Sequence, residues 1–460
     1  MGHNISNFFT RSQGVKQGCI LSPLLFNIFL SDFQKDIEKE NNDPVQITLE
    51  ESLGCIIWAD DILLLSKSEL GLSNMLNTLK TYTENNGMNI NVAKTKVMIF
   101  NKNGKHIRKS FPYGENRIES TRQYKYLGFL VTPSGEIHSG LKDLKDRALR
   151  AFIKLKKKMG WFFQKFPLVS IKLFETLVKP ILLYASDFWG ILKLPKNNPT
   201  ELIHHMFCKH LLGVQKQTTN VGVLLELGQI PLNIYAKKMA IKNWKRISLK
   251  KEANSLVIKS YEFALKEKLN WPSLTKNNLS EIGMMQSFQG DNMIHEKAFA
   301  RMRDIFHQEA FATISKESSK LRTYKEIKQE IGFETFLANM TNTRNRTTLT
   351  KFRLSNHTLM IEKGRHQRID KNLRFCPFCP NCVEDEMHFL MDCKCFAIHR
   401  KGFFTKINET IRDNNLQFQN RKEKFVTLLS NRDIIPHTAQ YLVQTMYVRD
   451  LLLENYKNLV

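Results

Sequence analysis

Two adjacent aspartates, Asp60 and Asp61, interrupt a short apolar stretch and could bind a hard cation. Their flanks, residues 54–59 and 62–65, are rich in Ile and Leu like buried strands, which predicts the acidic pair at the turn of a tight hairpin. Both carboxylates could then face one Mg²⁺ or Mn²⁺ ion, and Mg²⁺ retains waters that suit a phosphate substrate. This arrangement fits nucleotidyl transfer. An ordinary polar turn is the alternative, because Asp favours turns.

A second group of chemically competent side chains lies further along the chain. Three cysteines and a histidine follow the spacing C-x2-C-x8-H-x4-C: Cys376, Cys379, His388 and Cys393. In an intracellular chain such clustering indicates a closed, tetrahedral Zn²⁺ site of Cys₃His type more than disulfides. One of these ligands could instead be replaced by a neighbour: Cys382, Cys395 or His399.

Helices are predicted on both sides of the aspartate hairpin. Ser22 followed by Pro23 is typical of a helix start. Apolar residues then recur at helical spacing and are assigned to the core: Leu24, Leu25, Ile28, Phe29, Phe33 and Ile37. Residues 140–161 predict a basic helix with one apolar stripe, which either binds a phosphate backbone or is a solvated face.

Three more blocks accompany the aspartate pair in order along the chain. They are the glycine and glutamine loop at residues 13–18 with the helix after it, the segment 87–100 with its lysines, and Tyr124-Lys125-Tyr126-Leu127-Gly128. Together with Ala59-Asp60-Asp61, these blocks resemble the second half of the palm of a non-LTR (LINE-type) retrotransposon reverse transcriptase.

The resemblance implies a role for each block. Asp60 would bind metal directly and Asp61 would support it or complete the site. The loop residues Gly14, Gln17 and Gly18 would contact the template. The segment 87–100 would be a strand unit in which Lys94 and Lys96 approach the incoming dNTP, although lysines at a strand end are often only solvated charges. Tyr126, Leu127 and Gly128 would form the primer-grip strand.

One part of the family's metal site has no counterpart in this sequence. Two-metal polymerases stabilise both the attacking and the leaving oxygen of an in-line displacement, and the resemblance implies three carboxylates to hold the ions. In the family the first of them precedes the glycine and glutamine loop, but residues 1–12 contain no Asp or Glu. We therefore expect a C-terminal fragment of a longer reverse transcriptase that is inactive alone. The alternative is a non-catalytic remnant that binds nucleic acid through the zinc module and the basic helix at residues 140–161, which the resemblance assigns to the thumb.

Composition favours a nucleic-acid partner. The chain has 69 Lys and Arg against 44 Asp and Glu, a formal charge of +25, and this balance favours phosphate backbones. The expected partners are an RNA template and a DNA primer or duplex, with dNTP in the longer parent. No apolar run of membrane-spanning length and no signal-peptide pattern occurs, so we expect an intracellular protein, nuclear or cytoplasmic, without a membrane partner.

The expected fold class is α+β. A partial palm, a helix plus a small antiparallel sheet, would precede a mostly helical thumb and connection region and a small zinc-binding module. The expected boundaries are residues 1–135 for the palm with its primer-grip strand, 136–268 for the thumb and connection, 269–290 for a linker, 291–348 for a helical region, 349–400 for the zinc module and 401–460 for C-terminal helices.

Overall fold

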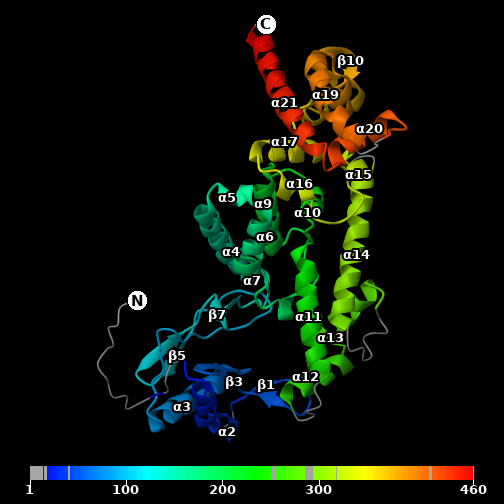
Figure 1. Cartoon of the computed structure of the whole chain (residues 1–460). Helices are drawn as coiled ribbons and strands as arrows, with labels where there is room; N and C mark the ends of the chain where they lie inside the picture. The colour runs from blue at the N-terminus through cyan, green and yellow to red at the C-terminus, as the bar shows by residue number, and fades with distance from the viewer. Residues whose placement is uncertain are drawn as a thin grey trace, which may run out of the picture. The chain divides into compact units, whose positions relative to one another are not determined.

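Residues 1–137 and 247–270 pack as one unit of the computed structural model, and residues 138–246 and 271–460 pack as a second. We call these the N-terminal and the C-terminal unit (Figure 1). The structure describes Gly14 and residues 18–39, 42–249, 255–268, 270–284, 294–316, 319–413 and 417–458. None of the described helices combines the length and the apolar character needed to cross a bilayer.

The N-terminal unit combines helices with short paired strands. Its helices are α1 (Ser22–Phe29), α2 (Phe33–Lys39), α3 (Glu69–Asn85) and α12 (Leu256–Lys266). Its strands are β1 (Val45–Gln46), β2 (Ser52–Leu53), β3 (Cys55–Trp58), β4 (Asp61–Leu64), β5 (Ser110–Tyr113), β6 (Asn116–Glu119), β7 (Tyr124–Tyr126) and β8 (Phe129–Val131). Each strand pairs antiparallel with its neighbour in sequence, so separate hairpins replace the single small sheet that was expected.

The predicted palm helix is broken into two. The chain leaves the helix at Leu30 and starts α2 at Phe33. Phe33 and Ile37 are buried as predicted, and Leu30 joins them in the core. The prediction was wrong for four residues of α1, which are exposed: Leu24, Leu25, Ile28 and Phe29. Helical periodicity identifies an apolar face, but it does not say whether a partner covers that face.

The C-terminal unit is mainly helical. It contains α4 (His138–Met159), α5 (Phe162–Lys165), α6 (Pro167–Leu177), α7 (Lys179–Leu182), α8 (Ser186–Trp189), α9 (Pro199–Leu212), α10 (Asn220–Glu226) and most of α11 (Leu232–Ser248). It continues with α13 (Asn270–Glu281), α14 (Ile294–Ser315), α15 (Tyr324–Ile327), α16 (Thr335–Asn339), α17 (Thr343–Arg353) and α18 (Met360–His366). Its last elements are the β9–β10 hairpin (Phe375–Cys376 and Cys379–Val383), α19 (Ala397–Asp413), α20 (Arg421–Ser430) and α21 (Ile435–Asn458).

One hydrophobic core runs through most of this unit. It begins with Ala148 and Phe152 on α4 and extends to Leu442 on α21, and it includes the cysteines of the β9–β10 hairpin. Two buried charge pairs also span the unit. Arg353 on α17 contacts Glu226 at 2.8 Å, and Arg449 on α21 contacts Glu384 at 2.7 Å. The region expected as a zinc-binding module therefore shares its hydrophobic core with the helices around it.

The stretch predicted as a linker, residues 269–290, contains helix α13. Leu279 and Ile282 from this stretch are buried. The stretch has too few apolar residues for periodicity to predict a helix. The buried side chains of Leu279 and Ile282 nevertheless pack it into the C-terminal unit. The predicted palm boundary at residue 135 lies next to the division between the units at residue 137.

Candidate catalytic hairpin and metal centre

The two aspartates lie at the tip of the β3–β4 hairpin. Trp58 pairs with Asp61, which leaves Ala59 and Asp60 as a two-residue turn. Both aspartates are exposed, and Ala59 has a φ of 52°, in the left-handed region that L-residues other than Asn and Asp seldom adopt. The predicted hairpin turn is confirmed. Its geometry places two adjacent carboxylates at an exposed tip, where a cation and a phosphate can reach them.

Helices α2 and α3 pack against the base of the β3–β4 hairpin, at the end opposite the two aspartates. A Cβ at Gly54, just before β3, would lie 2.9 Å from Ile37 on α2 and 3.3 Å from Met75 on α3. Both of these side chains are buried in the core of the N-terminal unit. Because only glycine permits this close approach, Gly54 lets the two helices pack against the base of the hairpin.

Tyr126, the last residue of β7, interacts electrostatically with Asp61 of the aspartate hairpin. Partial burial and then the negative charge of Asp61 raise the pKa of Tyr126. Leu127 and Gly128 form the turn of the β7–β8 hairpin, with φ values of 44° and 80°. The expected Tyr-Leu-Gly strand is therefore a strand end followed by a tight turn, because two consecutive positive φ values reverse the chain.

The predicted lysines lie outside any strand. Lys94 and Lys96 are exposed in a turn and an irregular segment after Gly87, and the backbone N–H of Lys94 donates to the Oδ1 of Asn91 at 3.1 Å. The expectation of a strand unit over residues 87–100 was wrong. In this segment only Val97 pairs with another strand position, through an isolated bridge with Ser120. The backbone between Asn91 and Val97 begins with a turn, which Asn favours.

The loop before α1 is described only in part. Gly14 and Gly18 are exposed and have φ values of 78° and 81°, a backbone conformation that favours glycine. An added Cβ at Gly18 would meet no atom within 4 Å. The remaining predicted template contact, Gln17, lies outside the described residues.

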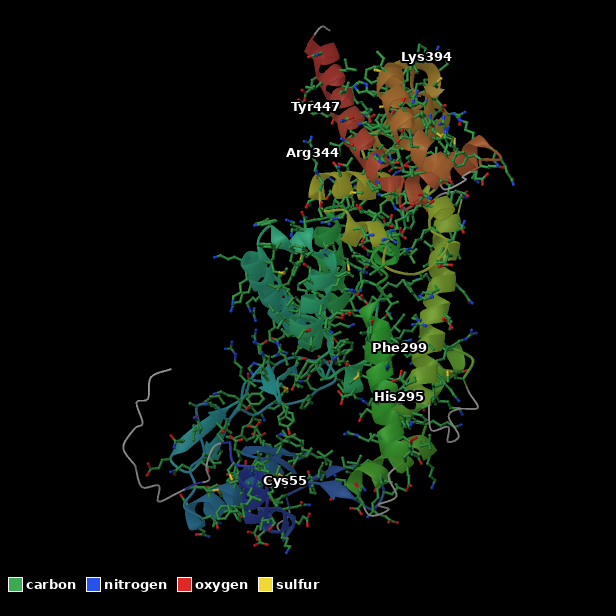
Figure 2. All side chains as sticks on the ribbon, in the orientation of Figure 1. Cys55, His295, Phe299, Arg344, Lys394 and Tyr447 are labelled. Carbon is green, nitrogen blue, oxygen red and sulfur yellow. The ribbon has the colours of Figure 1, made fainter. Side chains whose placement is uncertain are left out.

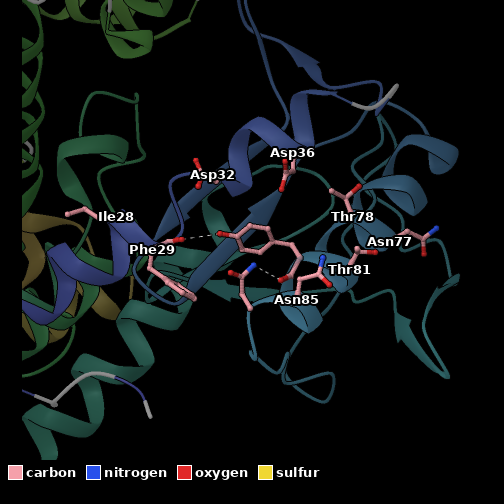
Figure 3. Close-up of a pocket in the computed structure, with 10 residues that line it drawn as sticks. Ile28, Phe29, Asp32, Asp36, Asn77, Thr78, Thr81 and Asn85 are labelled. Carbon is pink, nitrogen blue, oxygen red and sulfur yellow. Dashed lines mark hydrogen bonds between the residues drawn. The ribbon is translucent and has the colours of Figure 1, made fainter. Parts of the chain in front are cut away.

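The described residues bring no third carboxylate to the aspartate hairpin. Within that part of the chain, neither Asp60 nor Asp61 belongs to a group of three potential metal ligands. Asp32 and Asp36 instead line an open pocket of about 740 Å³ together with residues of α3 (Figure 3). In that pocket Tyr82 donates its hydroxyl to the carbonyl of Phe29 at 3.0 Å. The aspartate hairpin thus has the donor chemistry for Mg²⁺ but only two of the three carboxylates expected.

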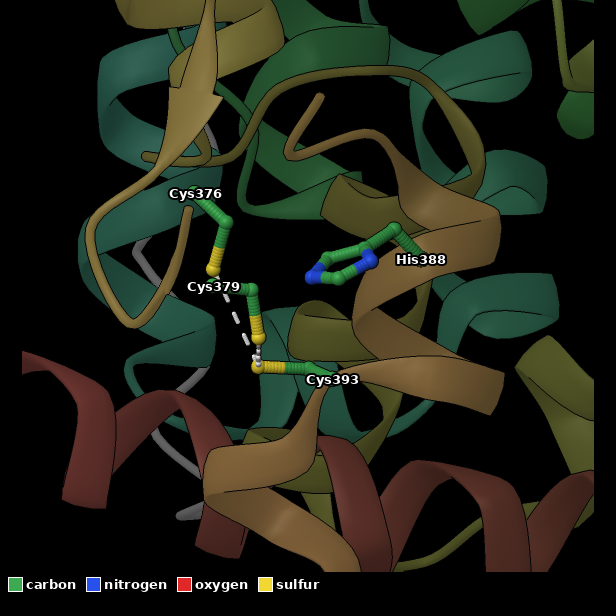
Figure 4. A group of neighbouring side chains, drawn as sticks. All are labelled: Cys376, Cys379, His388 and Cys393. Atoms are coloured by element: carbon green, nitrogen blue, oxygen red, sulfur yellow. Dashed lines mark hydrogen bonds between the residues drawn. The ribbon is translucent and has the colours of Figure 1, made fainter. Parts of the chain in front are cut away.

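The four residues of the C-x2-C-x8-H-x4-C pattern converge in the C-terminal unit. Their potential ligand atoms all lie within 4.8 Å of one another (Figure 4). The Sγ of Cys393 lies 3.8 Å from the Sγ of Cys376 and 3.8 Å from that of Cys379. A tetrahedron with Zn–S bonds of about 2.3 Å has edges of about 3.8 Å, whereas a disulfide requires about 2.05 Å. The Nε2 atom of His388 is buried without a hydrogen-bond partner, as a nitrogen reserved for a metal would be.

Local hydrogen bonds place each of these ligands. Cys376 and Cys379 face each other across the β9–β10 hairpin. The backbone N–H of His388 donates to the Oδ1 of Asp385 at 2.7 Å, and the guanidinium of Arg400 donates to the carbonyl of Cys393. Sequence reasoning missed Asp385 and Arg400, although an Asp three residues before His388 is a typical helix-start signal.

The neighbours that could have replaced a ligand take other positions. Cys382 and His399 are exposed, and neither belongs to the group of four. Cys395 is half-buried, and burial followed by the charges of Cys376 and Cys379 raises its pKa. Cys395 is therefore near the group without being part of it.

Comparison with known sequences relates the first part of the chain to one enzyme family. The sequence model of the reverse transcriptase (RNA-dependent DNA polymerase) family matches residues 1–131. This match contains the aspartate hairpin and the β7–β8 turn.

Curated relatives come from mobile elements of insects. The RNA-directed DNA polymerase from mobile element jockey of Drosophila melanogaster is 24% identical over 211 residues, which is 44% of this chain and 22% of the relative. The Pol polyprotein from type-1 retrotransposable element R2 of Nasonia vitripennis is 24% identical over 233 residues, 47% of this chain and 22% of the relative. The R2 polyprotein of Popillia japonica is 28% identical over 141 residues, 29% of this chain and 23% of the relative.

The matched part thus spans about a fifth of the length of these relatives. Within it, the paired aspartates on a hairpin and the Tyr-Leu-Gly turn follow one another along the chain in the predicted order. Residues 1–131 therefore match the reverse transcriptase family, and the relatives that the chain resembles are proteins of non-LTR retrotransposons.

Proposed function

We propose that this chain takes part in RNA-directed DNA synthesis by a non-LTR retrotransposon, with Asp60 and Asp61 as ligands for Mg²⁺ or Mn²⁺. The observation that carries the proposal is the exposed aspartate pair at the hairpin turn with Tyr126 beside it, inside the segment that matches the reverse transcriptase family. Bound there, the ions would stabilise charge on the attacking and leaving oxygens of nucleotidyl transfer. The chain's own contribution is to fix two carboxylates on a hairpin anchored by α2 and α3.

The proposed partners are an RNA template, a DNA primer and dNTP, in the cytoplasm or nucleus. The +25 formal charge supports the nucleic-acid part of this proposal. Because the described residues bring only two carboxylates to the aspartate hairpin, and residues 1–12 contain no Asp or Glu, we propose that the 460-residue chain does not polymerise alone.

A primer-extension assay with a primed RNA template tests this proposal. The folded chain is compared with Asp60→Asn/Asp61→Asn and with the control Asp32→Asn/Asp36→Asn, which removes two acids outside the hairpin, one exposed and one half-buried. We expect template binding without incorporation of dNTP. Incorporation that only the hairpin variant abolishes would support the metal site and contradict the claim of inactivity.

A second readout addresses the metal directly. Fe²⁺ bound in place of Mg²⁺ generates radicals that cleave nearby backbone, so cleavage next to residues 59–62 is expected in the wild-type chain. Asp60→Asn/Asp61→Asn should lose this cleavage and Asp32→Asn/Asp36→Asn should keep it. Equal cleavage in both variants would contradict a metal site at the hairpin. In that case nucleic-acid binding alone would favour the non-catalytic remnant.

We also propose that Cys376, Cys379, His388 and Cys393 hold a structural Zn²⁺. The 3.8 Å sulfur spacing and the unpartnered Nε2 of His388 support this assignment. The expected result is one zinc per purified chain, and visible absorption of a tetrahedral thiolate site after exchange for Co²⁺. Cys393→Ser should lose both signals, whereas the neighbouring control Cys395→Ser should keep them. Retention of zinc by Cys393→Ser would contradict the ligand set.

A further inference from the structure

Three aromatic rings stack on one another at the surface of the C-terminal unit. Trp161 follows α4, Phe162 starts α5 and Phe166 follows α5. The rings of Trp161 and Phe162 lie 4.0 Å apart at 26°, and those of Phe162 and Phe166 lie 5.8 Å apart at 16°. Their exposed fractions are 65%, 45% and 43%. We call these three residues the aromatic platform. Its apolar faces are open to solvent, which commonly marks an interaction site.

Positive charge lies beside the aromatic platform and just before it in the sequence. The Nζ of Lys165 lies 4.6 Å from the ring centre of Trp161 and 5.6 Å from that of Phe166. Residues 151–174 contain no Asp or Glu, and the last turn of α4 carries three exposed lysines: Lys156, Lys157 and Lys158. The platform therefore pairs open aromatic faces with a local excess of cations.

Buried groups fix the backbone beneath the platform. Phe163 packs between Phe152 and Phe207, with ring centres 5.9 Å from each. Gln164 donates its side-chain amide to the carbonyl of His210 at 2.8 Å. The buried guanidinium of Arg346 on α17 donates to the carbonyl of Gln164, and more weakly to that of Lys165 at 3.4 Å. The platform is thus held open by the core instead of folding onto it, which reduces the ordering cost of binding.

We propose that the aromatic platform binds unpaired nucleobases of single-stranded RNA or DNA, while the neighbouring lysines contact the phosphates. Every base has a flat π face, so stacking on aromatic side chains tolerates any sequence, and positive charge beside the rings follows the backbone. The lysines distinguish this ligand from an apolar peptide, which would have no use for them. The inference rests on the nucleic-acid partner of the proposed function but not on its chemistry at Asp60 and Asp61.

Equilibrium binding to three labelled probes tests the proposal: a short single-stranded RNA, an abasic strand with the same number of phosphates, and a closed duplex hairpin. The variants are Trp161→Ala/Phe166→Ala, the conservative Trp161→Phe, and the control Tyr447→Ala, which removes an exposed aromatic ring elsewhere in the same unit (Figure 2). Unchanged thermal unfolding ensures that each variant is folded.

We expect Trp161→Ala/Phe166→Ala to weaken binding of the single strand by about 10- to 100-fold. Binding of the abasic strand and of the duplex should change by less than about 3-fold, and Trp161→Phe should stay close to wild type. Equal losses on the abasic strand and the RNA would show that the rings do not read bases, and would overturn the proposal. Full retention of single-strand binding would overturn it as well.

Two further outcomes separate this inference from the proposed function. If the wild-type chain binds single strands and the platform variant binds them equally well, only the inference fails. If the folded chain binds none of the three probes, both the inference and the nucleic-acid partner of the proposed function fail. An apolar peptide whose binding is abolished by Trp161→Ala/Phe166→Ala, and which competes with none of the probes, would also contradict the inference.

Discussion

At the scale of single residues, the charged groups buried in the C-terminal unit are more decisive for stability than those at its surface. Arg353 is fully buried and contacts Glu226 and Glu334, each at 2.8 Å. Tyr324 donates its hydroxyl to the same Glu226 at 2.8 Å. The participants come from segments up to 127 residues apart, so no local pattern in the sequence could have paired them.

Replacing Arg353 tests this ion network. Arg353→Ala leaves the buried Glu226 without its ion-pair partner, whereas Glu334 keeps Lys328. We expect the free energy of unfolding to fall by about 3–5 kcal/mol. The matched control is Arg344→Ala, at an exposed position of the same helix α17, which should change it by less than about 0.5 kcal/mol. Urea unfolding followed by circular dichroism provides the measurement. Equal effects of the two substitutions would mean that the network contributes nothing beyond a surface arginine.

The buried His205 on α9 predicts a pH dependence of stability. Burial lowers its pKa to about 4; the nearby positive charges of His204 and Lys209 act in the same direction, against the charge of Glu201. Since the unfolded imidazole titrates near 6.5, the unfolded state binds more protons between pH 6.5 and 4, and stability falls as the pH falls through that window. The loss amounts to roughly 3 kcal/mol. His205→Asn should remove this pH dependence. The free energy of unfolding of the variant should therefore rise relative to that of the wild type as the pH falls, and the difference should become constant below about pH 4. A constant difference across the window would contradict the shift.

At the scale of elements, the sequence predicts what depends on local pattern and fails where a distant partner decides. The β3–β4 hairpin, the basic helix α4 and the spacing of the cysteines and histidine all follow from neighbours a few residues apart. The break at Leu30 and the exposure of Leu24 cannot be predicted from near neighbours, because they depend on which distant side chains cover the apolar face of α1. The turn at Lys94 was missed because it is stabilised by one side chain, Asn91, whose Oδ1 accepts a hydrogen bond from the backbone N–H of Lys94.

The β7–β8 turn yields a prediction at this scale. Gly128 has a φ of 80°, where a Cβ is strained, and it follows Leu127, which already has a φ of 44°. We expect Gly128→Ala to lower the free energy of unfolding by about 1–2 kcal/mol. Gly128→Asn should cost less, because Asn tolerates the left-handed region. Thermal unfolding of the two variants decides the matter, and an alanine variant as stable as the asparagine one would show that the turn can adopt another conformation.

At the scale of the whole molecule, the net charge of +25 makes any nucleic-acid complex sensitive to salt, and the structure indicates which cations matter. The exposed lysines at the end of α4 lie in a stretch without acids, whereas Lys35 in the N-terminal unit pairs with Asp32 at 3.6 Å. We expect the triple substitution Lys156→Gln/Lys157→Gln/Lys158→Gln to reduce the slope of log affinity against log salt by about 2 for a single strand, since each phosphate contact contributes about 0.7.

The charge-matched control replaces three exposed lysines of the N-terminal unit with glutamine: Lys35, Lys102 and Lys105. Both triple variants lose the same net charge, so a general attraction would lower the two slopes equally. A larger decrease in the slope for the α4 variant would instead show that the released counterions come from phosphates bound beside the aromatic platform. Titration of a labelled single strand at several salt concentrations measures both slopes. Equal slopes in the two variants would mean that the basic character of the chain acts as a diffuse field and that α4 has no special part in binding.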